Sequence, residues 1–401
     1  MRIGMMADGY KPHVSGVTIH ISLNKQFLEQ AGHEVFVFTF GDEGNVDDEP
    51  NVIRTPGMPL VDSGIYFNLR YSPKAQRLLR TMDVAHVHHP FFSGSLALRY
   101  CKPRGIPIVF TNHTRYDLYA QFYTPEPIPD VIGDVVVRAF VPKFCRACDL
   151  VIAPSPGIKE VLRKFGVDGN VEIVPNGVDL APFQMQVEPI QRAELGFQGD
   201  QVILTYMGRL GPEKNLPFLL RAFKGVALTY DHVGLLIVGD GPERENLVEQ
   251  ARLLGIANRV HFTGMIPYSQ LPRYLAAADA FVTASVTEVH PLSVIESMAA
   301  GLPVLGIQSP GVGDIVEHGV TGLIAPDQDL AVFTAGMVRL VTDPQLRNRM
   351  SEQARAAATN YAIERTTQLI LEKYQQLIEK KVGKKQGLRT RLTLVVDKVL
   401  R

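Results

Sequence analysis

Short apolar runs alternate with longer amphipathic segments along the whole chain. Over the first 40 residues this pattern predicts a strand at 3–6, a polar loop at 8–16, a helix at 17–30 and a second strand at 34–40. The stretch 184–201 is polar and irregular, and the same alternation then begins again. The further predicted strands lie at 84–88, 106–111, 150–153, 202–207, 234–238, 260–262, 280–283 and 304–306, and further helices begin near 217 and 243.

Strands and helices that alternate in this way build βαβ units with parallel sheets. The chain is therefore predicted to be an α/β protein of two doubly wound, Rossmann-like domains that face each other across a cleft. The first covers 1–183 and the second 184–374, while helices over 375–401 pack back on the first domain or on a membrane. Ligands of such sheets bind beyond the carboxyl ends of the strands, so the residues that follow each apolar run are the candidate site.

Composition narrows the class of protein. With 46% hydrophobic and 20% charged residues, the 401-residue chain is not a disordered protein. No apolar run approaches the roughly 18 residues that span a bilayer, and Asp8 comes too early for a signal peptide. Three cysteines are too few for a disulfide framework. These features predict a cytoplasmic protein, and the net charge of zero disfavours nucleic acid as a partner.

Charge is unevenly distributed. Residues 380–401 carry eight basic side chains and one acidic one, which leaves the rest of the chain at −7. Two interpretations stay open: an interfacial helix on an anionic membrane, or a terminal helix packed on the body with its cations in water. The apolar positions of this tail fall on one helical face: Leu388, Leu392, Val395, Val396 and Val399. A second cationic face, either solvated or bound to lipid, is formed by Arg70, Lys74, Arg77 and Arg80.

Candidate chemistry follows the strands of the second half. Arg209 and Lys214 lie in a loop that precedes a helix, where two cations and a helix N-terminus suit a diphosphate, although both could simply be solvated. Gly239 follows the next strand and would let the backbone approach a ligand or form a tight turn. The segment 262–267, with Ile266, is an apolar edge that could face a base.

Two carboxylates eight residues apart are the most specific feature. Glu288 lies just before the predicted helix start at Pro291, and Glu296 lies one to two turns inside the helix. Together they can contact two separated groups of one long ligand, because carboxylates accept hydrogen bonds from paired sugar hydroxyls. An acid near the positive end of a helix explains Glu288 without a ligand, but it does not explain Glu296 beside Met298, Ala299 and Ala300.

In this ordered set of loops the chain resembles the retaining glycosyltransferases of family 4, which have the two-domain GT-B fold, over nearly its whole length to at least Tyr374. The resemblance implies that Glu288 contacts the donor sugar and that Glu296 holds the ribose hydroxyls. It also implies a diphosphate clamp of Arg209 and Lys214. Many members have Gly-Phe-Gly after the first Glu, where this chain has His290-Pro291. The complete predicted donor-binding set is Gly16, Arg209, Lys214, Gly239, Ile266, Leu292 and Glu296.

The N-terminal segments 8–17 and 112–123 are similar to the lipid-glycosylating branch of the family, the diacylglycerol and phosphatidylinositol glycosyltransferases. The aromatic stripe of Tyr116, Tyr119 and Tyr123 is either core or the lining of an acyl channel. The family places a His directly after this strand beside the donor sugar, so His113 and Glu288 are the predicted catalytic residues. The predicted acceptor or membrane contacts are Tyr10, His88, Tyr116, Tyr119, Arg70, Lys74 and Arg77.

No essential metal or cofactor is expected. His86, His88 and His89 could ligate a metal, but neither carboxylate nor Cys lies near them in the sequence. Cys145 and Cys148 form a lone pair, and Asp327-Gln328-Asp329 is better placed to cap a helix.

The predicted function is transfer of a hexose from a nucleotide diphosphate sugar, UDP-linked by expectation, to a membrane lipid such as diacylglycerol, with retention at the anomeric carbon. The enzyme would act as a peripheral protein on the inner face of the cell membrane. The alternatives are a soluble sugar or polysaccharide acceptor, a nucleotide-sugar epimerase or hydrolase, and a nucleotide-binding module without catalysis.

Overall fold

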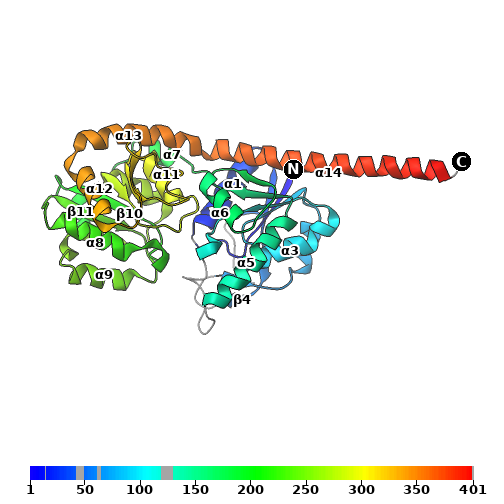
Figure 1. Ribbon diagram of the computed structural model, residues 1–401, viewed down its shortest axis with the longest axis horizontal. Coiled ribbons are helices and arrows are strands. Elements are labelled where there is room, and N and C mark those ends of the chain that lie inside the picture. Colours follow the sequence, from blue (N-terminus) through cyan, green and yellow to red (C-terminus); the bar gives the residue numbers. More distant parts are fainter. Residues whose placement is uncertain (14, 42–48, 61–64, 119–129, 400–401) are drawn as a thin grey trace.

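The chain forms two α/β units that lie side by side, with a long C-terminal helix along one edge (Figure 1). The computed structural model describes the backbone of residues 1–13, 15–41, 49–60, 65–118 and 130–399. Side chains of these residues are described except at 60, 65, 130–134, 136 and 383–399. Nothing in this described part is a helix both long and apolar enough to cross a bilayer.

The N-terminal unit is built on a parallel sheet with the strand order β3-β2-β1-β6-β7-β8-β9. Its strands are nearly continuous apolar runs, as expected for a sheet that is buried on both faces. Their bounds are Arg2–Met6 (β1), Glu34–Gly41 (β2), Val52–Pro56 (β3), Val84–Val87 (β6), Ile108–Thr111 (β7), Leu150–Ala153 (β8) and Val171–Ile173 (β9). An antiparallel pair, Met58–Leu60 (β4) and Ile65–Phe67 (β5), stands apart from the sheet. The helices are Gly16–Gln30 (α1), Pro73–Leu79 (α2), Phe92–Tyr100 (α3), Asp130–Ala147 (α5) and Pro156–Lys164 (α6).

The C-terminal unit repeats the architecture with the order β12-β11-β10-β13-β14-β15. Its strands are Val202–Met207 (β10), Val233–Val238 (β11), Val260–Phe262 (β12), Ala280–Val282 (β13), Val304–Ile307 (β14) and Gly322–Ala325 (β15). The helices are Ala181–Gln184 (α7), Leu216–Ala227 (α8), Arg244–Leu253 (α9), Leu271–Ala276 (α10), Leu292–Ala299 (α11), Leu330–Thr342 (α12) and Pro344–Ala358 (α13). In both sheets the order reverses beside the first strand, so the predicted fold class of two doubly wound units is confirmed.

Helix α14, Ile363–Val399, returns from the second unit to the first. It begins well before the expected residue 375, and its apolar side chains join the core around β1 and α1. The Tyr374 hydroxyl lies 2.6 Å from Nδ1 of His86 at the centre of the N-terminal sheet. The core residues that α14 contributes are Ile370, Leu371, Tyr374 and Leu377. Helix α14 is thus part of the N-terminal core from Ile370 onward, a few residues before the boundary expected at 374.

Two chain connections run next to each other between the units. The N–H of Val178 donates to the carbonyl of Tyr361, and the N–H of Ile363 donates to the carbonyl of Val178, both at 2.9 Å. The space is tight, since a methyl group on Gly177 would approach backbone and side-chain atoms of Ile363 to 2.8 Å. The linker and the return into α14 thus form one paired crossing.

Polar contacts also join the two units directly. The N–H of Gly157 donates to Asp314 at 2.7 Å, and the Ser155 hydroxyl donates to the carbonyl of Pro310 at 3.1 Å. Near the predicted site, Nδ2 of Asn176 donates to the carbonyl of His290 at 3.1 Å. The loops that follow the strands of each unit therefore meet those of the other.

Candidate active site

The loop after β10 supplies the two predicted diphosphate cations. The Arg209 side chain is 50% exposed, and its Nη1 lies 3.6 Å from Oε1 of Glu213. The Tyr206 hydroxyl donates to the Arg209 carbonyl at 3.2 Å, which ties the loop to the end of its strand. His13, in the first loop of the other unit, has its pKa lowered by partial burial and by the Arg209 charge. Arg209 therefore lies near the first loop of the N-terminal unit.

Lys214 and Glu288 form an ion pair between two of the predicted loops. The Lys214 Nζ lies 2.7 Å from Glu288 Oε1, and each side chain is 19% exposed. Burial acts to lower the pKa of Lys214, but the Glu288 carboxylate outweighs it and the pKa is raised. The Thr287 hydroxyl donates to the Glu213 carbonyl at 3.2 Å and holds the same loops together. Lys214, predicted to bind the diphosphate, and Glu288, predicted to bind the sugar, are thus adjacent.

Glu296 is a buried acid on α11. Glu296 is 3% exposed, and the Tyr268 hydroxyl donates to its Oε1 at 2.5 Å. Burial raises the pKa of Glu296 to about 7, while the Tyr268 hydrogen bond acts in the opposite direction. Tyr268 itself is 38% exposed and follows the predicted base-facing edge at Ile266 by two residues. The second carboxylate is therefore held by a phenol that also reaches solvent.

The two predicted glycines play different parts. Gly16 is the first residue of α1, after the N-cap Ser15, and no atom of the described residues lies within 4 Å of where its Cβ would be. Gly239 has a φ of +133°, and a Cβ there would lie 2.1 Å from the Gly208 carbonyl oxygen. Gly239 is thus required for the packing of two loops, whereas Gly16 borders open space. Leu292 is 8% exposed and belongs to the core of the C-terminal unit.

Alanine at these two glycines should give opposite results. Gly239→Ala should destabilise the protein by about 3 kcal/mol or more, because of backbone strain and the clash with Gly208. Gly16→Ala should leave the melting temperature nearly unchanged but weaken donor binding, since the new methyl group occupies space that a ligand would use. Thermal unfolding and nucleotide titration of both variants measure this, and a Gly16→Ala protein with normal donor affinity would contradict a role for Gly16.

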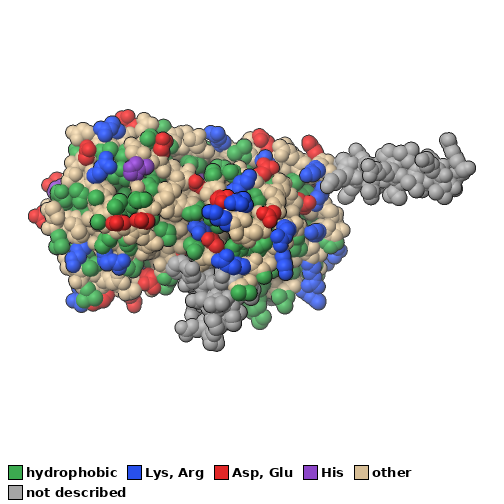
Figure 2. All heavy atoms as spheres, viewed as in Figure 1, with side chains coloured by type: hydrophobic (Ala, Val, Ile, Leu, Met, Phe, Trp, Pro, Cys, Tyr) green, Lys and Arg blue, Asp and Glu red, His purple; other side chains and the backbone are tan. Residues whose placement is uncertain are grey.

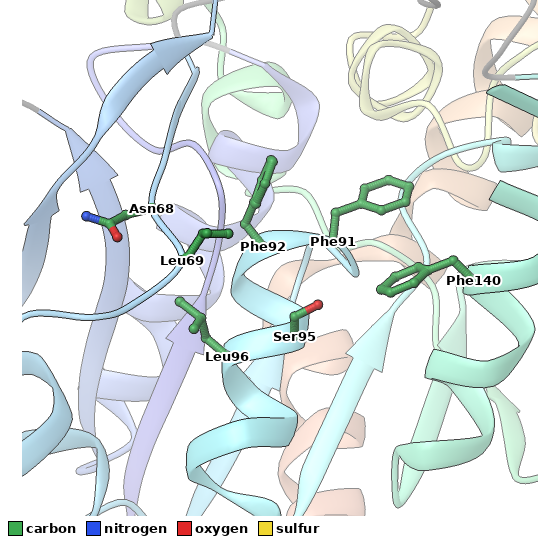
Figure 3. Close-up of a pocket in the computed structure, with 7 residues that line it drawn as sticks. All are labelled: Asn68, Leu69, Phe91, Phe92, Ser95, Leu96 and Phe140. Atoms are coloured by element: carbon green, nitrogen blue, oxygen red, sulfur yellow. The ribbon is translucent and has the colours of Figure 1, made fainter. Parts of the chain in front are cut away.

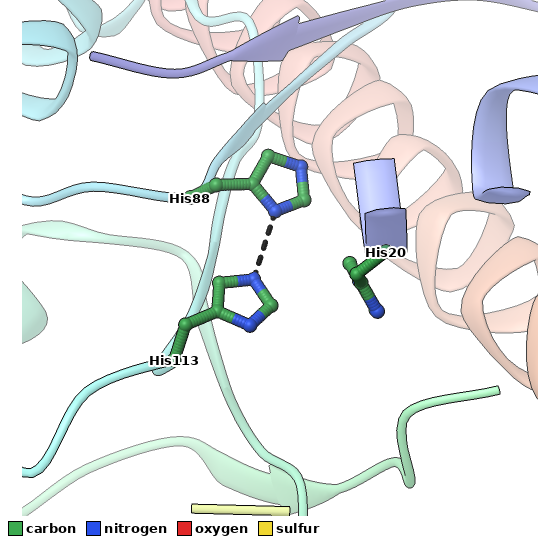
Figure 4. Close-up of side chains that lie close together, drawn as sticks. All are labelled: His20, His88 and His113. Carbon is green, nitrogen blue, oxygen red and sulfur yellow. Dashed lines mark hydrogen bonds between the residues drawn. The ribbon is translucent and has the colours of Figure 1, made fainter. Parts of the chain in front are cut away.

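Three histidines from separate elements meet in the N-terminal unit (Figure 4). His20 comes from α1, His88 follows β6 and His113 follows β7. His88 Nδ1 lies 3.0 Å from His113 Nε2, and the rings of His20 and His113 lie 4.8 Å apart between centroids. Burial lowers the pKa of His20 to about 4, and it lowers the pKa of His88 and of His113 well below the ordinary value. The cluster is therefore neutral at neutral pH, and it holds His113 by a ring-to-ring hydrogen bond.

The same cluster bears on the metal prediction. His86 is bonded to Thr111 at 2.7 Å as well as to Tyr374, and Nδ1 of His89 accepts from the N–H of Asp8 at 3.1 Å. The group with metal-ligand spacing is instead His20, His88 and His113, each offering a ring nitrogen within 4.8 Å of the others. The cluster contains no carboxylate or thiolate. The absence of an essential metal stays a prediction.

The predicted acceptor and membrane residues divide into buried and exposed ones. Tyr10 and Tyr116 are 3% and 5% exposed, and Tyr116 packs edge-on against Phe91 in the core. Neither ring can enter a headgroup layer, so the core interpretation of Tyr116 is the one that fits. Tyr119 lies outside the described residues. The three cations predicted to contact the membrane are all exposed: Arg70, Lys74 and Arg77.

Sequence reasoning missed Tyr268 and His20. Tyr268 is close in sequence to the predicted base edge, and its contact with Glu296 depends on how α11 packs. His20 lies one helical turn after Gly16, and this spacing was the available signal, because residues four apart share a helix face. Both contacts are formed by tertiary packing.

Comparisons with known proteins agree with this geometry. Residues 14–182 match the family model described as Glycosyltransferase Family 4, and residues 187–357 match Glycosyl transferases group 1. An alpha-monoglucosyldiacylglycerol synthase of Streptococcus pneumoniae is 33% identical over 341 residues, covering 82% of this chain and 77% of that protein. The protein of the same name from Acholeplasma laidlawii is 27% identical over 400 residues, 95% of this chain and 98% of its own.

Solved structures show the same fold. A sucrose-phosphate synthase from Thermosynechococcus elongatus superposes with a TM-score of 0.78 at 22% identity, over 94% of this chain and 99% of that one. HepE from Anabaena in complex with UDP-glucose superposes with a TM-score of 0.75 at 19% identity, over 94% and 100%. The two units thus have the GT-B arrangement, and the chain is a member of glycosyltransferase family 4.

Proposed function

We propose that this glycosyltransferase transfers a hexose from a UDP-sugar to the hydroxyl group of a diacylglycerol-type membrane lipid, with retention at the anomeric carbon. The observation that carries the donor half is the Lys214–Glu288 pair, which sets a phosphate-binding cation against a sugar-binding carboxylate. The lipid acceptor is supported by the similarity to the two alpha-monoglucosyldiacylglycerol synthases, one of them 33% identical.

In this proposal the chain's cations act on the leaving group. Arg209 and Lys214 stabilise the negative charge that develops on the departing diphosphate, and such preorganised electrostatics is usually the largest catalytic contribution. Glu288 is bonded to Lys214, so its role is to hold the sugar rather than to form a covalent bond to it. The acceptor then attacks from the side of the leaving group, and the leaving oxygen takes the acceptor's proton.

The neutral histidine cluster supports the binding of the donor sugar in this reaction. His113 follows β7 and is fixed by His88, so its ring presents a defined face at the carboxyl edge of the N-terminal sheet. A neutral imidazole can donate one hydrogen bond and accept another, which suits contact with a sugar hydroxyl. We assign His113 this positioning of the donor sugar.

The proposal places the N-terminal unit on an anionic membrane surface. Basic side chains gather over the part of this unit that carries α3 (Figures 1 and 2), and Arg70, Lys74 and Arg77 are exposed. Each basic residue near an anionic surface contributes about 1 kcal/mol. Such binding makes the enzyme a peripheral protein of the cytoplasmic leaflet. Lys381 pairs with Asp149 at 3.0 Å, whereas the tail side chains beyond 382 lie outside the described residues.

The test is label transfer from UDP-[14C]glucose and other labelled UDP-sugars to vesicles of diacylglycerol in phosphatidylglycerol. Label in a glycolipid is expected, and reversal of charge at Arg70, Lys74 and Arg77 to Glu should reduce vesicle flotation and transfer at least tenfold. The matched control reverses three exposed cations of the other unit: Arg221, Arg339 and Arg349. Transfer only to soluble saccharides, or UDP release without any acceptor, would overturn the proposal.

A further inference from the structure

An open apolar pocket lies on the surface of the N-terminal unit, with a volume of about 390 Å³. Figure 3 shows Leu69 and Leu96 on one side and Phe140 on the other, with the rings of Phe91 and Phe140 facing each other. The Phe91 and Phe140 rings are stacked at 5.4 Å between centroids, and Phe92 stacks on Phe67 at 5.1 Å. We call this the aromatic pocket. Of the described side chains that line it, Asn68 and Ser95 are the polar ones.

The aromatic pocket lies beside the proposed active site. The N–H groups of Phe92 and Ser93 donate to the carboxylate of Asp8, at 3.4 and 2.7 Å, and Asp8 follows β1. The first turn of α3 is thereby held at the carboxyl edge of the sheet. Phe91, which also lines the pocket, contacts Tyr116, and Tyr116 comes three residues after His113. A ligand in the pocket would therefore extend toward the loops that carry the histidine cluster.

A cationic border adjoins the pocket. Leu69, which lines it, is 72% exposed and is followed directly by Arg70. Residues 63–82 contain four basic side chains and no acidic one. Lys74 and Arg77 on α2 are exposed. An apolar pocket with few polar groups cannot satisfy the backbone of a peptide, whereas acyl chains need no hydrogen bonds and anionic headgroups complement the cations.

We propose that the aromatic pocket binds an acyl chain of the lipid acceptor, while Arg70, Lys74 and Arg77 hold the surrounding anionic headgroups. This inference rests on the proposed lipid acceptor, and it adds the site at which the acyl chain of that lipid binds. The volume is within the roughly 300–1,000 Å³ of small-molecule sites. Because a buried methylene contributes about fourfold in affinity, the pocket would make the enzyme sensitive to the length of the acceptor's chains.

A direct binding test uses the absence of tryptophan from the chain. Phe92→Trp introduces a single fluorophore at the pocket, and Leu228→Trp places one on the other unit, at a residue that is as exposed as Leu69 at 72%. Phosphatidylglycerol vesicles containing diacylglycerol brominated in its acyl chains should quench the Phe92→Trp emission at least twofold more than the Leu228→Trp emission. Equal quenching of the two variants would overturn the inference.

A kinetic test separates this inference from the proposed function. The wild type should show a KM for diacylglycerol that falls at least tenfold from eight-carbon to sixteen-carbon chains. Leu69→Ser with Phe92→Ser should flatten this dependence while the KM for the donor stays unchanged, and Leu228→Ser should behave as wild type. Phe92→Ser keeps the backbone bonds to Asp8. If the melting temperature nevertheless falls, Leu69→Ser alone, at an exposed side chain, decides.

The outcomes are distinguishable. A wild type that transfers to lipid, with a chain-length dependence that survives in the variants, overturns the acyl pocket and leaves the proposed function intact. A wild type that labels no lipid at all overturns both. Loss of the dependence together with a raised donor KM would indicate a general disturbance of the site, and this too counts against the pocket.

Discussion

Alanine at Arg209 is expected to lower kcat by about 100-fold or more, while the melting temperature changes by no more than a degree or two. The Arg209 side chain is half exposed, so folding depends on it little. Loss of one preorganised group that stabilises developing charge costs about 10²–10³ in kcat. Steady-state kinetics with a UDP-sugar, together with thermal unfolding, measures both quantities.

Two comparisons sharpen this prediction. Arg252→Ala removes an arginine that is 67% exposed in an ion pair on α9 and should have wild-type activity. Arg209→Lys keeps the charge without the planar fork and should recover only part of kcat. A folded Arg209→Ala protein with normal turnover would remove Arg209 from the diphosphate clamp.

Glutamine at Glu296 is expected to weaken donor binding and to stabilise the fold at alkaline pH. Loss of the hydrogen bonds from ribose hydroxyls to a carboxylate should raise the donor KM about 10- to 100-fold. Burial raises the pKa of this carboxyl group to about 7 in the folded protein, against an ordinary value of 4.5. The folded state therefore binds more protons between these values, and wild-type stability falls as pH rises from about 4.5 to about 7.

Chemical unfolding at pH 5 and pH 8 tests the stability half. Glu296→Gln should unfold with a free energy about 1–2 kcal/mol higher than wild type at pH 8, and the difference should shrink or vanish at pH 5. The matched control is Glu245→Gln, which changes an exposed acid in the first turn of α9. The wild-type affinity for the donor should decrease as the pH is lowered through about 7, because Glu296 becomes protonated. Affinity independent of both pH and this substitution would contradict a ribose contact at Glu296.

Much of the fold could be predicted because local patterns agree with the tertiary structure. The first βαβ unit was predicted to within a residue or two of β1, α1 and β2. Five short strands, β3, β4, β5, β9 and β15, were not predicted, because runs of three to five residues carry little periodic signal. The early start of α14 was also missed, since its identity as N-terminal core depends on contacts such as Tyr374 with His86, 288 residues apart in sequence.

The candidate site divides in the same way. Lys214 and Glu288 could be predicted to lie close together, because residues that follow parallel strands meet at one edge of a sheet. The structural need for a glycine at position 239 could not be predicted, since the Gly208 carbonyl that excludes a side chain belongs to a different loop. The burial of Tyr10, and the phenol of Tyr268 on Glu296, likewise depend on packing between segments distant in sequence.

The paired crossing at Val178 and Ile363 constrains how this enzyme can move. The two connections between the units are hydrogen-bonded to each other, so they would have to move together if the units moved relative to one another. We therefore expect the two units to open for substrate entry and product exit by rotation about this crossing. The two units are therefore not independent of each other. A protein that ended at residue 362 would lack α14, the helix that completes the core of the N-terminal unit.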